Sequence, residues 1–369
     1  MDRRKFVSTL GLGSAAALAA GCSPQDCGPA GETDGQTYRW RMVTTWPKNY
    51  PGVGTGPERF ARLVEAMSGG QMRIRVYGAG DLVPAFETFD AVSQGSAEMG
   101  HGASYYWRGK HPATPFFTAV PFGLNAQEMN AWISRGGGQK LWDDLYAGFN
   151  LKPFRAGCTG TQMAGWYNKE INSLADLRGL RIRIPGLGGE VMRKVGATPV
   201  QLPGGEVYTA MQTGAIDAAE WVGPYNDITF GFQRIARYYY YPGWQEPGPL
   251  LELIINLEKW QSLPPRLQTI IEAAALAVNQ EVYDEYTERN AAALEELLDK
   301  HKVQLRRLPD DVIDALKVAS DEVLEALVAG NAQAEAVYES YRAFEKRAAA
   351  YHAIAEEAYY QIRTRTRDL

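Results

Sequence analysis

The sequence predicts an α/β protein in which two similar lobes enclose a cleft and a long helical extension follows them. Three observations predict this architecture: strand and helix patterns alternate in two series, a ten-residue pattern recurs once in each series, and the pattern is almost wholly helical from Pro264 onward. With 369 residues, of which 45% are hydrophobic, the chain is long enough to bury a core in each of two domains.

The first series extends over residues 38–103. A helix is expected at 57–67, where Phe60 and Val64 share one face and two glycines follow. The other expected elements are strands at 38–45, 72–77 and 97–103 and a helix at 84–94. Because strands and helices alternate, this series predicts a largely parallel sheet.

The second series extends over residues 154–256. Its expected elements are strands at 154–166, 181–184, 199–201, 218–222 and 250–256 and helices at 189–195 and 205–213. From Pro264 to Arg363 the pattern is helical, with interruptions near 303–309 and at Gly330.

A ten-residue pattern at 89–98 recurs at 208–217. Each copy contains an aromatic residue, an alanine, a glycine and, three positions after the glycine, an acidic residue. Gly95 and Gly214 suit helix C-termini, because the left-handed conformation costs glycine little. Both lobes are therefore expected to contain the same unit of helix, glycine and strand, and clefted α/β proteins bind ligands beyond the carboxyl ends of their strands.

The first residues predict an export signal at 1–21. Arg3 and Arg4 precede an apolar stretch that is too short for an ordinary transmembrane span. Paired arginines before such a stretch resemble a twin-arginine signal. The residues before Cys22 also resemble a lipobox, so lipidation of Cys22 and ordinary signal-peptide cleavage are both left open. A linker rich in Ser and Gly is expected at 22–36.

Composition and motifs argue against several functional classes. The net charge of −5 disfavours nucleic-acid binding, which draws on clustered Lys and Arg. The three cysteines and four scattered histidines show no zinc-binding spacing. The sequence contains no complete glycine motif for a nucleotide and no arrangement of carboxylates with His or Ser for acid–base or nucleophilic work. A binding protein is therefore favoured over an enzyme.

Arg183 is the first candidate ligand-binding residue. Arg181 and Arg183 share one face of the strand expected at 181–184, and Pro185 ends the strand immediately afterwards. Arg183 therefore lies near a carboxyl end, where a guanidinium can hold a carboxylate through two parallel hydrogen bonds. The alternative is a pair of solvated arginines on an edge strand.

Two further segments stand out. Glu220 lies among apolar neighbours, so a buried carboxylate here must be paired, either with Arg183, with a cation or with both. Residues 238–249 begin with four consecutive tyrosines and contain three prolines, which indicates a rigid loop lined by aromatic side chains.

The segments GLRIRIPG, EWVGPYND and YYPGWQEPGP resemble the extracytoplasmic solute receptors of TRAP transporters, and most of all the receptors for 2-oxo acids. The resemblance covers nearly all of the mature chain. It implies a two-lobed periplasmic binding protein fold, a small monocarboxylate bound together with a metal cation, TRAP membrane subunits as partners, and a homodimer supported by the long C-terminal helix. Expected boundaries are 37–155 for most of lobe 1, 156–255 for most of lobe 2 and 256–369 for helices that complete lobe 1, span both lobes and dimerise.

The same resemblance implies roles for individual residues. Arg183 corresponds to the arginine that holds the ligand carboxylate, and Gln162 to a glutamine that contacts both ligand and cation. The remaining cation ligands correspond to Glu220, the main-chain carbonyl of Trp221 and Gln245, whose neighbour Glu246 could exchange roles with it. The first lobe is expected to contribute Phe86 and Tyr105 or Tyr106, together with Thr45 and Trp46.

Carboxylate and carbonyl oxygens are hard ligands that suit Na⁺ or Ca²⁺. The charges of Arg183 and Glu220 balance with Na⁺ and one 2-oxo acid such as pyruvate, or with Ca²⁺ and two 2-hydroxy acids such as lactate. The first pairing is preferred. Two hypotheses from other classes are an exported enzyme with a bound cofactor and a sensor subunit that presents the ligand to a kinase.

Overall fold

The computed structural model describes residues 35–364. The predicted export signal, most of the predicted linker and the predicted lipid attachment at Cys22 lie outside that range. From Thr37 onward the chain is one compact unit. In the part that is described, no helix combines the length and the apolar character that a membrane crossing requires.

The first sheet has five strands in the order β2-β1-β3-β10-β4. Its strands are β1 (Tyr38–Thr44), β2 (Met72–Tyr77), β3 (Met99–Gly102), β4 (Leu151–Cys158) and β10 (Leu250–Asn256). The strands β2, β1 and β3 are parallel, as the alternating pattern predicts, whereas β10 is antiparallel to β3 and β4. The helices of this first lobe are α1 (Thr55–Met67), α2 (Thr88–Ser93), α3 (Ala126–Arg135) and α4 (Gly138–Ala147).

The second sheet has six strands in the order β11-β9-β5-β8-β6-β7. Its strands are β5 (Gly165–Tyr167), β6 (Arg181–Arg183), β7 (Thr198–Val200), β8 (Ala218–Ala219), β9 (Tyr238–Tyr241) and β11 (Gln304–Arg307). Here β7, β6 and β8 are parallel and β5 is antiparallel to both of its neighbours, so each sheet is mixed. The helices of this second lobe are α5 (Gly186–Lys194), α6 (Gly204–Gln212) and α7 (Pro224–Phe230).

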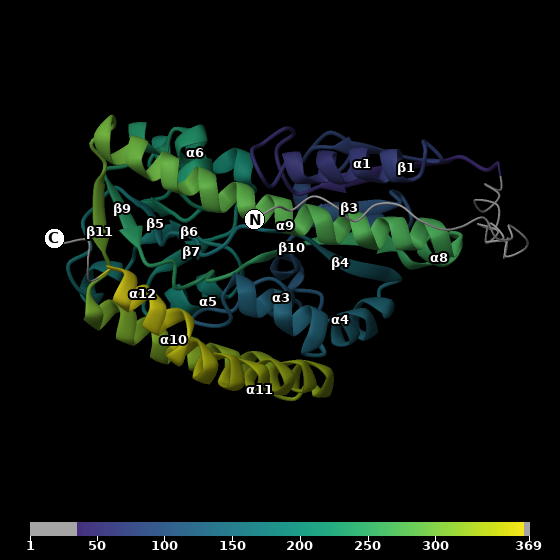
Figure 1. The fold of residues 1–369 in the computed structure, drawn as a ribbon. Helices are drawn as coiled ribbons and strands as arrows, with labels where there is room; N and C mark the ends of the chain where they lie inside the picture. Colours follow the sequence, from purple (N-terminus) through teal and green to yellow (C-terminus); the bar gives the residue numbers. More distant parts are fainter. Residues whose placement is uncertain (1–34, 365–369) are drawn as a thin grey trace, which may run out of the picture. The chain divides into compact units, whose positions relative to one another are not determined.

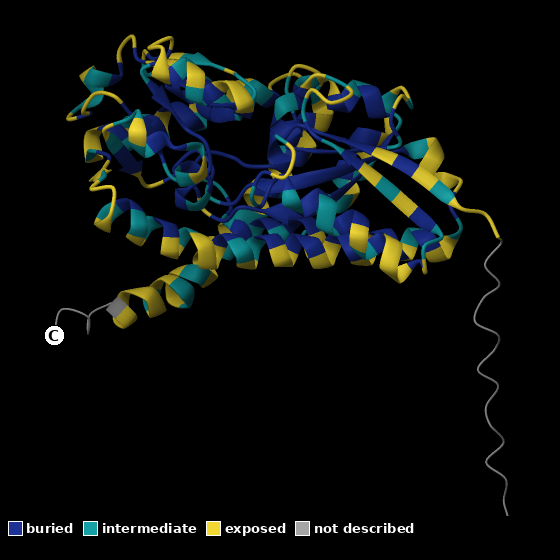
Figure 2. Ribbon diagram, turned by 90° about the horizontal axis from the view of Figure 1, so that it is seen from above, coloured by how far each residue is buried: buried dark blue, intermediate teal, exposed yellow. Residues whose placement is uncertain are grey.

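The C-terminal region is helical, as predicted (Figure 1). It consists of α8 (Leu257–Gln261), α9 (Pro265–Asp299), α10 (Asp310–Val328), α11 (Ala332–Ile354) and α12 (Glu356–Thr364). The long helix α9 packs on α1 and β4 of the first lobe and on α7 of the second, α10 packs on α5, and α11 packs on α3 and α4. Helices expose one face and most strands are buried (Figure 2).

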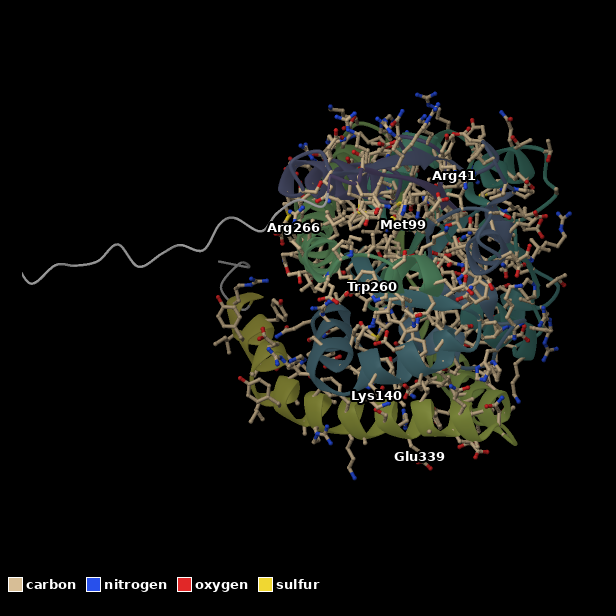
Figure 3. All side chains as sticks on the ribbon, turned by 90° about the vertical axis from the view of Figure 1, so that its right-hand side faces the viewer. Arg41, Met99, Lys140, Trp260, Arg266 and Glu339 are labelled. Atoms are coloured by element: carbon tan, nitrogen blue, oxygen red, sulfur yellow. The ribbon has the colours of Figure 1, made fainter. Side chains whose placement is uncertain are left out.

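Side-chain positions follow this layering. Met99 on β3 is fully buried, whereas Lys140 on α4 and Glu339 on α11 are exposed at the outside of the molecule (Figure 3). Apolar side chains form a core on either side of the first sheet and a core in the second lobe. They occur at the helical and strand positions that face inward.

Three predicted assignments need correction. The strand expected at 250–256 in the second series is β10, which belongs to the first sheet. The strand expected at 154–166 is two strands, β4 and β5, which belong to different sheets. The tyrosines expected in a loop form strand β9, because opposite faces of that strand are both covered. The Tyr239 ring stacks on Trp166 with 4.1 Å between ring centroids, and the hydroxyl of Tyr240, on the other face, accepts a hydrogen bond from the Ile171 amide at 2.7 Å.

The recurring ten-residue pattern has the predicted structure in both lobes. Gly95 and Gly214 follow the ends of α2 and α6 with φ of +77° and +72°. The acidic residue of each copy then binds an arginine on the neighbouring strand: Glu98 binds Arg41 at 2.8 Å and Asp217 binds Arg181 at 2.6 Å. Both acidic side chains also accept from the main-chain amide of that arginine, so the pattern connects two strands in each sheet.

Candidate functional site

Two chain segments cross between the sheets, at 159–164 after β4 and at 242–249 before β10. The amide of Gln162 donates to the carbonyl of Glu246 at 3.1 Å, so the two crossings lie side by side. They approach so closely that a Cβ on Gly243 would collide with the carbonyl of Gln162. This contact brings candidate residues from distant parts of the sequence to one place.

A small cavity lies at these crossings. Side chains of both lobes and of both crossings surround it, which is the expected position for a ligand in a two-lobed protein. Its lining consists of Trp46, Val53, Tyr105, Tyr106, Thr159, Gln162, Arg183, Trp221, Val222, Glu246, Pro249 and Leu251.

Arg183 ends strand β6 and is only 1% exposed. Its Nη1 donates to the main-chain carbonyl of Glu220 at 2.8 Å and lies 3.3 Å from the Glu220 carboxylate, and its Nε donates to the carbonyl of Leu202 at 3.3 Å. The guanidinium also lies over the Trp221 ring, 5.2 Å from its centroid. Within residues 35–364 these contacts use Nε and Nη1, and Arg183 also forms part of the cavity lining.

Two carboxyl groups lie beside this guanidinium. Glu220 is fully buried, and burial raises its pKa well above the ordinary value, with a further contribution from the nearby Glu246 and an opposing one from Arg183. Burial also raises the pKa of Glu246 to about 8, again against the effect of Arg183. The Arg183 guanidinium is thus the single positive charge beside two buried carboxyl groups, and a bound metal cation would stabilise the ionised forms of both carboxyl groups.

Four buried side-chain oxygens, three on the two crossings and one on Glu220, have no hydrogen-bond partner in the described part of the chain: Gln162 Oε1, Gln245 Oε1, Glu246 Oε2 and Glu220 Oε1. The two glutamine amide nitrogens are already used, since Gln162 donates to Thr159 at 3.2 Å and Gln245 donates to the Met163 carbonyl at 2.8 Å. Unpaired buried oxygens are costly. A hard cation such as Na⁺ or Ca²⁺ takes oxygens of this kind as ligands, so the residues present fit such an ion.

The wall on the side of the first lobe is aromatic. Tyr105 lies against the start of α5, where Gly186 has φ of +60° and an added Cβ would come within 3.1 Å of the Tyr105 ring. Trp46 is held by His101, whose Nδ1 accepts from the Trp46 indole at 2.9 Å and whose Nε2 contacts the carbonyl of Ala156 at 3.1 Å. Aromatic side chains with few rotatable bonds suit a fixed wall for a small ligand.

The predicted residues do not all line the cavity. Gln162, Arg183, Trp221 and Tyr105 do, whereas Glu220 is outside the lining and lies 3.3 Å from Arg183. Of the pair after β9, Glu246 lines the cavity and Gln245 packs beside Gly188. The Phe86 ring lies 4.9 Å from that of Tyr106, so it supports the wall from outside the lining. Thr45 is buried, and its hydroxyl has no partner within the described residues.

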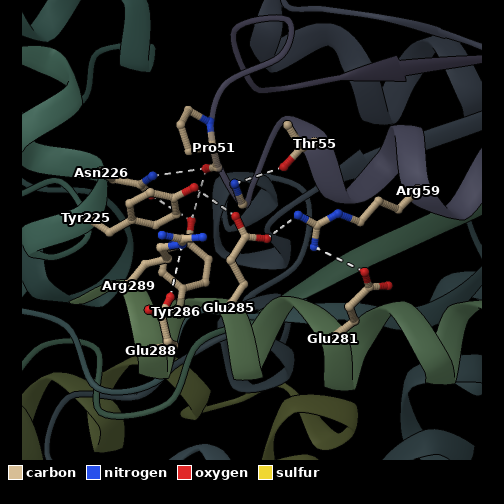
Figure 4. Close-up of polar contacts among 11 residues, drawn as sticks. Pro51, Thr55, Arg59, Tyr225, Asn226, Glu281, Glu285, Tyr286, Glu288 and Arg289 are labelled. Carbon is tan, nitrogen blue, oxygen red and sulfur yellow. Dashed lines mark hydrogen bonds and ion pairs between the residues drawn. The ribbon is translucent and has the colours of Figure 1, made fainter. Parts of the chain in front are cut away.

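Sequence reasoning missed the contacts that join the lobes beside the cavity. The Tyr50 hydroxyl donates to the Asn226 carbonyl at 2.6 Å and accepts from the Trp221 indole at 3.1 Å. Asn226 in turn donates to the Pro51 carbonyl at 2.9 Å and accepts from the Tyr286 hydroxyl at 2.6 Å (Figure 4). These contacts connect residues about 60 to 180 positions apart, and no local pattern reveals them.

Further polar contacts join α1 of the first lobe and α7 of the second lobe to α9. Arg59 on α1 forms ion pairs with Glu285 and Glu281, and the Tyr225 hydroxyl on α7 donates to Glu285 at 2.8 Å (Figure 4). Glu285 therefore contacts one helix from each lobe. Helix α9 is thus connected to both lobes by packing and by polar side chains.

Comparison with known proteins extends these findings. Residues 42–331 match the family described as bacterial extracellular solute-binding protein, family 7. A monocarboxylate 2-oxoacid-binding periplasmic protein of Nostoc sp. is 42% identical over 97% of this chain and 98% of its own length.

Solved structures of similar proteins include those from three bacteria. A TRAP transporter solute-binding protein of Bordetella bronchiseptica, with calcium and picolinate in one site, is 38% identical, covers 90% of this chain and 100% of its own, and has a TM-score of 0.88. Proteins of Pseudoalteromonas atlantica, with sodium and pyruvate, and Colwellia psychrerythraea, with calcium and pyruvate, are each 40% identical, cover 88% of this chain and 99% of their own, and have TM-scores of 0.86.

Proposed function

Because the chain belongs to the family of bacterial extracellular solute-binding proteins, family 7, we propose that it is the solute receptor of a TRAP transporter and binds a small 2-oxo monocarboxylate such as pyruvate together with Na⁺ or Ca²⁺. Members of this family are described as extracellular solute-binding proteins. The proposal for this chain therefore concerns binding and delivery, not chemical conversion of the acid.

The four buried oxygens without a hydrogen-bond partner carry the proposal, together with the Glu220 carboxylate's position beside Arg183. A 2-oxo acid has a carboxylate and, on the next carbon, a carbonyl oxygen, so one ligand can bind a guanidinium and a cation at once. Arg183 supplies the guanidinium through Nη2, and Gln162, Glu220 and the main-chain carbonyl of Trp221 supply cation ligands. Pyruvate and picolinate, bound in the similar proteins, both place a second donor atom next to the carboxylate.

Glu246 changes the charge balance that the sequence predicts. If Arg183, Glu220 and Glu246 are all charged, adding one monocarboxylate and Ca²⁺ gives a net charge of zero. The same groups with Na⁺ in place of Ca²⁺ have a net charge of −1. We therefore assign Glu246 to the cation site beside or in place of Gln245. Similar proteins with either ion support a site that accepts both.

Closure of the two lobes would distinguish the ligand-bound receptor from the empty one. Ligand and cation contact both lobes in the closed form and only part of these groups in an open form, so they favour closure. The closed receptor would then bind the membrane subunits of the transporter. We place the protein in the periplasm, with attachment through a lipid on Cys22 as a further proposal about the export region.

A homodimer is also proposed. The last two helices expose an apolar group of side chains, Tyr351, Ile354, Tyr359, Tyr360 and Ile362, between 52% and 78% exposed. Surfaces of this kind suit a protein partner, and the similar protein of Bordetella bronchiseptica was crystallised as a dimer.

The test is to identify what the protein carries. Gently purified protein is denatured, and the released small molecules and metals are measured by mass spectrometry and elemental analysis. We expect a 2-oxo acid with an equal amount of Na⁺ or Ca²⁺. A 2-hydroxy acid at two molecules per Ca²⁺ would replace the proposed ligand class, and a redox cofactor would contradict the receptor function.

A further inference from the structure

Glu252 is a fully buried carboxylate outside the lining of the cavity. It lies on β10, in a strand whose other side chains are apolar apart from the last. Its Oε1 accepts from the Trp107 indole, and its Oε2 accepts from the Ser104 hydroxyl at 2.6 Å and from the Tyr146 hydroxyl at 2.8 Å. Burying a carboxylate among neutral donors is expensive, so a specific use of these three hydrogen bonds is expected.

Two of the three donors belong to one short turn. Ser104 and Trp107 are the first and last residues of the 3₁₀ turn η2 (Ser104–Trp107) that follows β3. Residues three apart lie on the same side of a 3₁₀ turn, so both point to Glu252. The residues between them, Tyr105 and Tyr106, line the ligand cavity. Glu252 therefore binds Ser104 and Trp107 of the turn, whereas Tyr105 and Tyr106 of the same turn form part of the cavity wall.

The turn also contacts the second lobe. Tyr105 lies against Gly186 at the start of α5. The next residue after the turn, Arg108, forms an ion pair with Glu190 on α5 at 2.6 Å. A shift of η2 would move the cavity wall and this contact together.

We propose that Glu252 is a positioning residue for ligand selection: by holding η2 at both ends, it fixes Tyr105 and Tyr106 and so limits the size of the acid that the closed cavity accepts. This inference rests on the proposed function, because the wall that Glu252 supports is taken to face a small 2-oxo acid. Glu252 itself touches neither ligand nor cation.

The structure offers a matched pair of variants. Ser104→Ala and Tyr146→Phe each remove one hydroxyl donor from the same oxygen, Oε2, but Ser104 is part of η2 and Tyr146 is on α4. Both leave Glu252 with two donors, and both are expected to lower the melting temperature. Only Ser104→Ala releases one end of the turn.

Dissociation constants for pyruvate and for the bulkier 4-methyl-2-oxopentanoate are measured by calorimetry with Ca²⁺ present, for wild type and both variants. Ser104→Ala is expected to weaken pyruvate binding about fivefold and to weaken binding of the larger acid less, so that selectivity for pyruvate falls about threefold or more. Tyr146→Phe is expected to keep wild-type selectivity. Equal effects of the two variants on selectivity, or none in either, would overturn the inference.

A second comparison uses Glu252 directly. Glu252→Gln keeps an acceptor for Trp107, and its amide can donate to the hydroxyls, which can rotate to accept. It should therefore retain more selectivity for pyruvate than Glu252→Ala; a Gln variant as unselective as the Ala variant would count against positioning by hydrogen bonds. If the wild type binds both acids and these variants keep its selectivity, only the inference is refuted. If the wild type binds neither acid, the proposed function is refuted and the inference with it.

Discussion

The Arg183 guanidinium lies 3.3 Å from the Glu220 carboxylate, and neither side chain is more than 1% exposed. Arg183 is the last residue of β6 and Glu220 directly follows the neighbouring parallel strand β8, and the Glu220 amide donates to the Arg183 carbonyl at 2.9 Å. A buried pair of this kind repays its desolvation only when further groups satisfy the remaining donors and oxygens. Nη2 of Arg183 and Oε1 of Glu220 are therefore the atoms to which the proposed acid and cation are assigned.

Arg183→Lys should weaken pyruvate binding by more than about tenfold, because one ammonium cannot hold the carbonyls of Leu202 and Glu220 and a ligand carboxylate together. Equilibrium dialysis with labelled pyruvate measures this. Arg181→Lys is the matched control, since Arg181 lies on the same strand, exposed, and binds Asp217. Unchanged affinity in Arg183→Lys would remove Arg183 from the ligand site.

Glu246→Gln should lower the affinity for Ca²⁺ more than the affinity for Na⁺, because it removes one negative charge from the cavity wall and keeps the side chain's size. Calorimetric titration of each ion, with pyruvate present, gives the two affinities. Glu87→Gln, at an exposed position, serves as the control. Equal loss for both ions would show that charge at Glu246 does not discriminate between them.

Tyr50→Phe should weaken ligand binding about tenfold, since it removes a hydrogen bond to Asn226 and leaves the Trp221 indole without its acceptor in the closed form. Tyr225→Phe loses a hydroxyl contact to Glu285 on α9 and should change affinity little. Small-angle scattering with saturating pyruvate reports the fraction of closed protein. Full closure and wild-type affinity in Tyr50→Phe would contradict a role of this contact in closing the lobes.

Burial lowers the pKa of His101 from its ordinary 6.5 to about 4. The unfolded chain therefore binds more protons between these values, and His101 lowers the free energy of unfolding as the pH falls from 6.5 towards 4, by about 3 kcal/mol in total. Denaturant unfolding of wild type and His101→Gln across this range gives the difference. The wild type should lose stability relative to the variant on acidification; a constant difference would place a charged His101 in the folded protein.

Ile354→Asp should convert the proposed dimer to monomer, because Ile354 is 78% exposed in the single chain and a charge there would oppose burial against a partner. Sedimentation velocity resolves the two species. Val318→Asp, at a 59% exposed position on α10, should leave the dimer intact. If both variants sediment as the wild type does, the C-terminal helices do not form the interface.

Local sequence was sufficient for part of the site and fold. Strand β10 occurs at the predicted residues 250–256, and Arg183 could be named as a partner of Glu220 because a carboxylate buried among apolar neighbours needs one. Strand β9 was missed because its tyrosines are covered by partners that only the tertiary structure brings there.

Other residues were missed for identifiable reasons. Tyr50 and Asn226 meet across the two lobes, and neither belongs to a local pattern. Glu252 could have been found, because an acidic residue in the apolar run 250–256 gives the same signal that drew attention to Glu220. Glu246 was recognised only as a neighbour of Gln245, since which of two adjacent side chains faces a cavity depends on the backbone around the crossing.

Joint binding of an organic acid and an ion is tested most directly by titrating pyruvate into protein that has been dialysed against a chelator and a choline buffer free of Na⁺ and Ca²⁺. Calorimetry should show little heat in that buffer and saturable binding of one pyruvate per chain once either ion is restored. Pyruvate binding that is equally strong without any metal ion, or no binding with either ion present, would contradict the site described around Arg183 and Glu220.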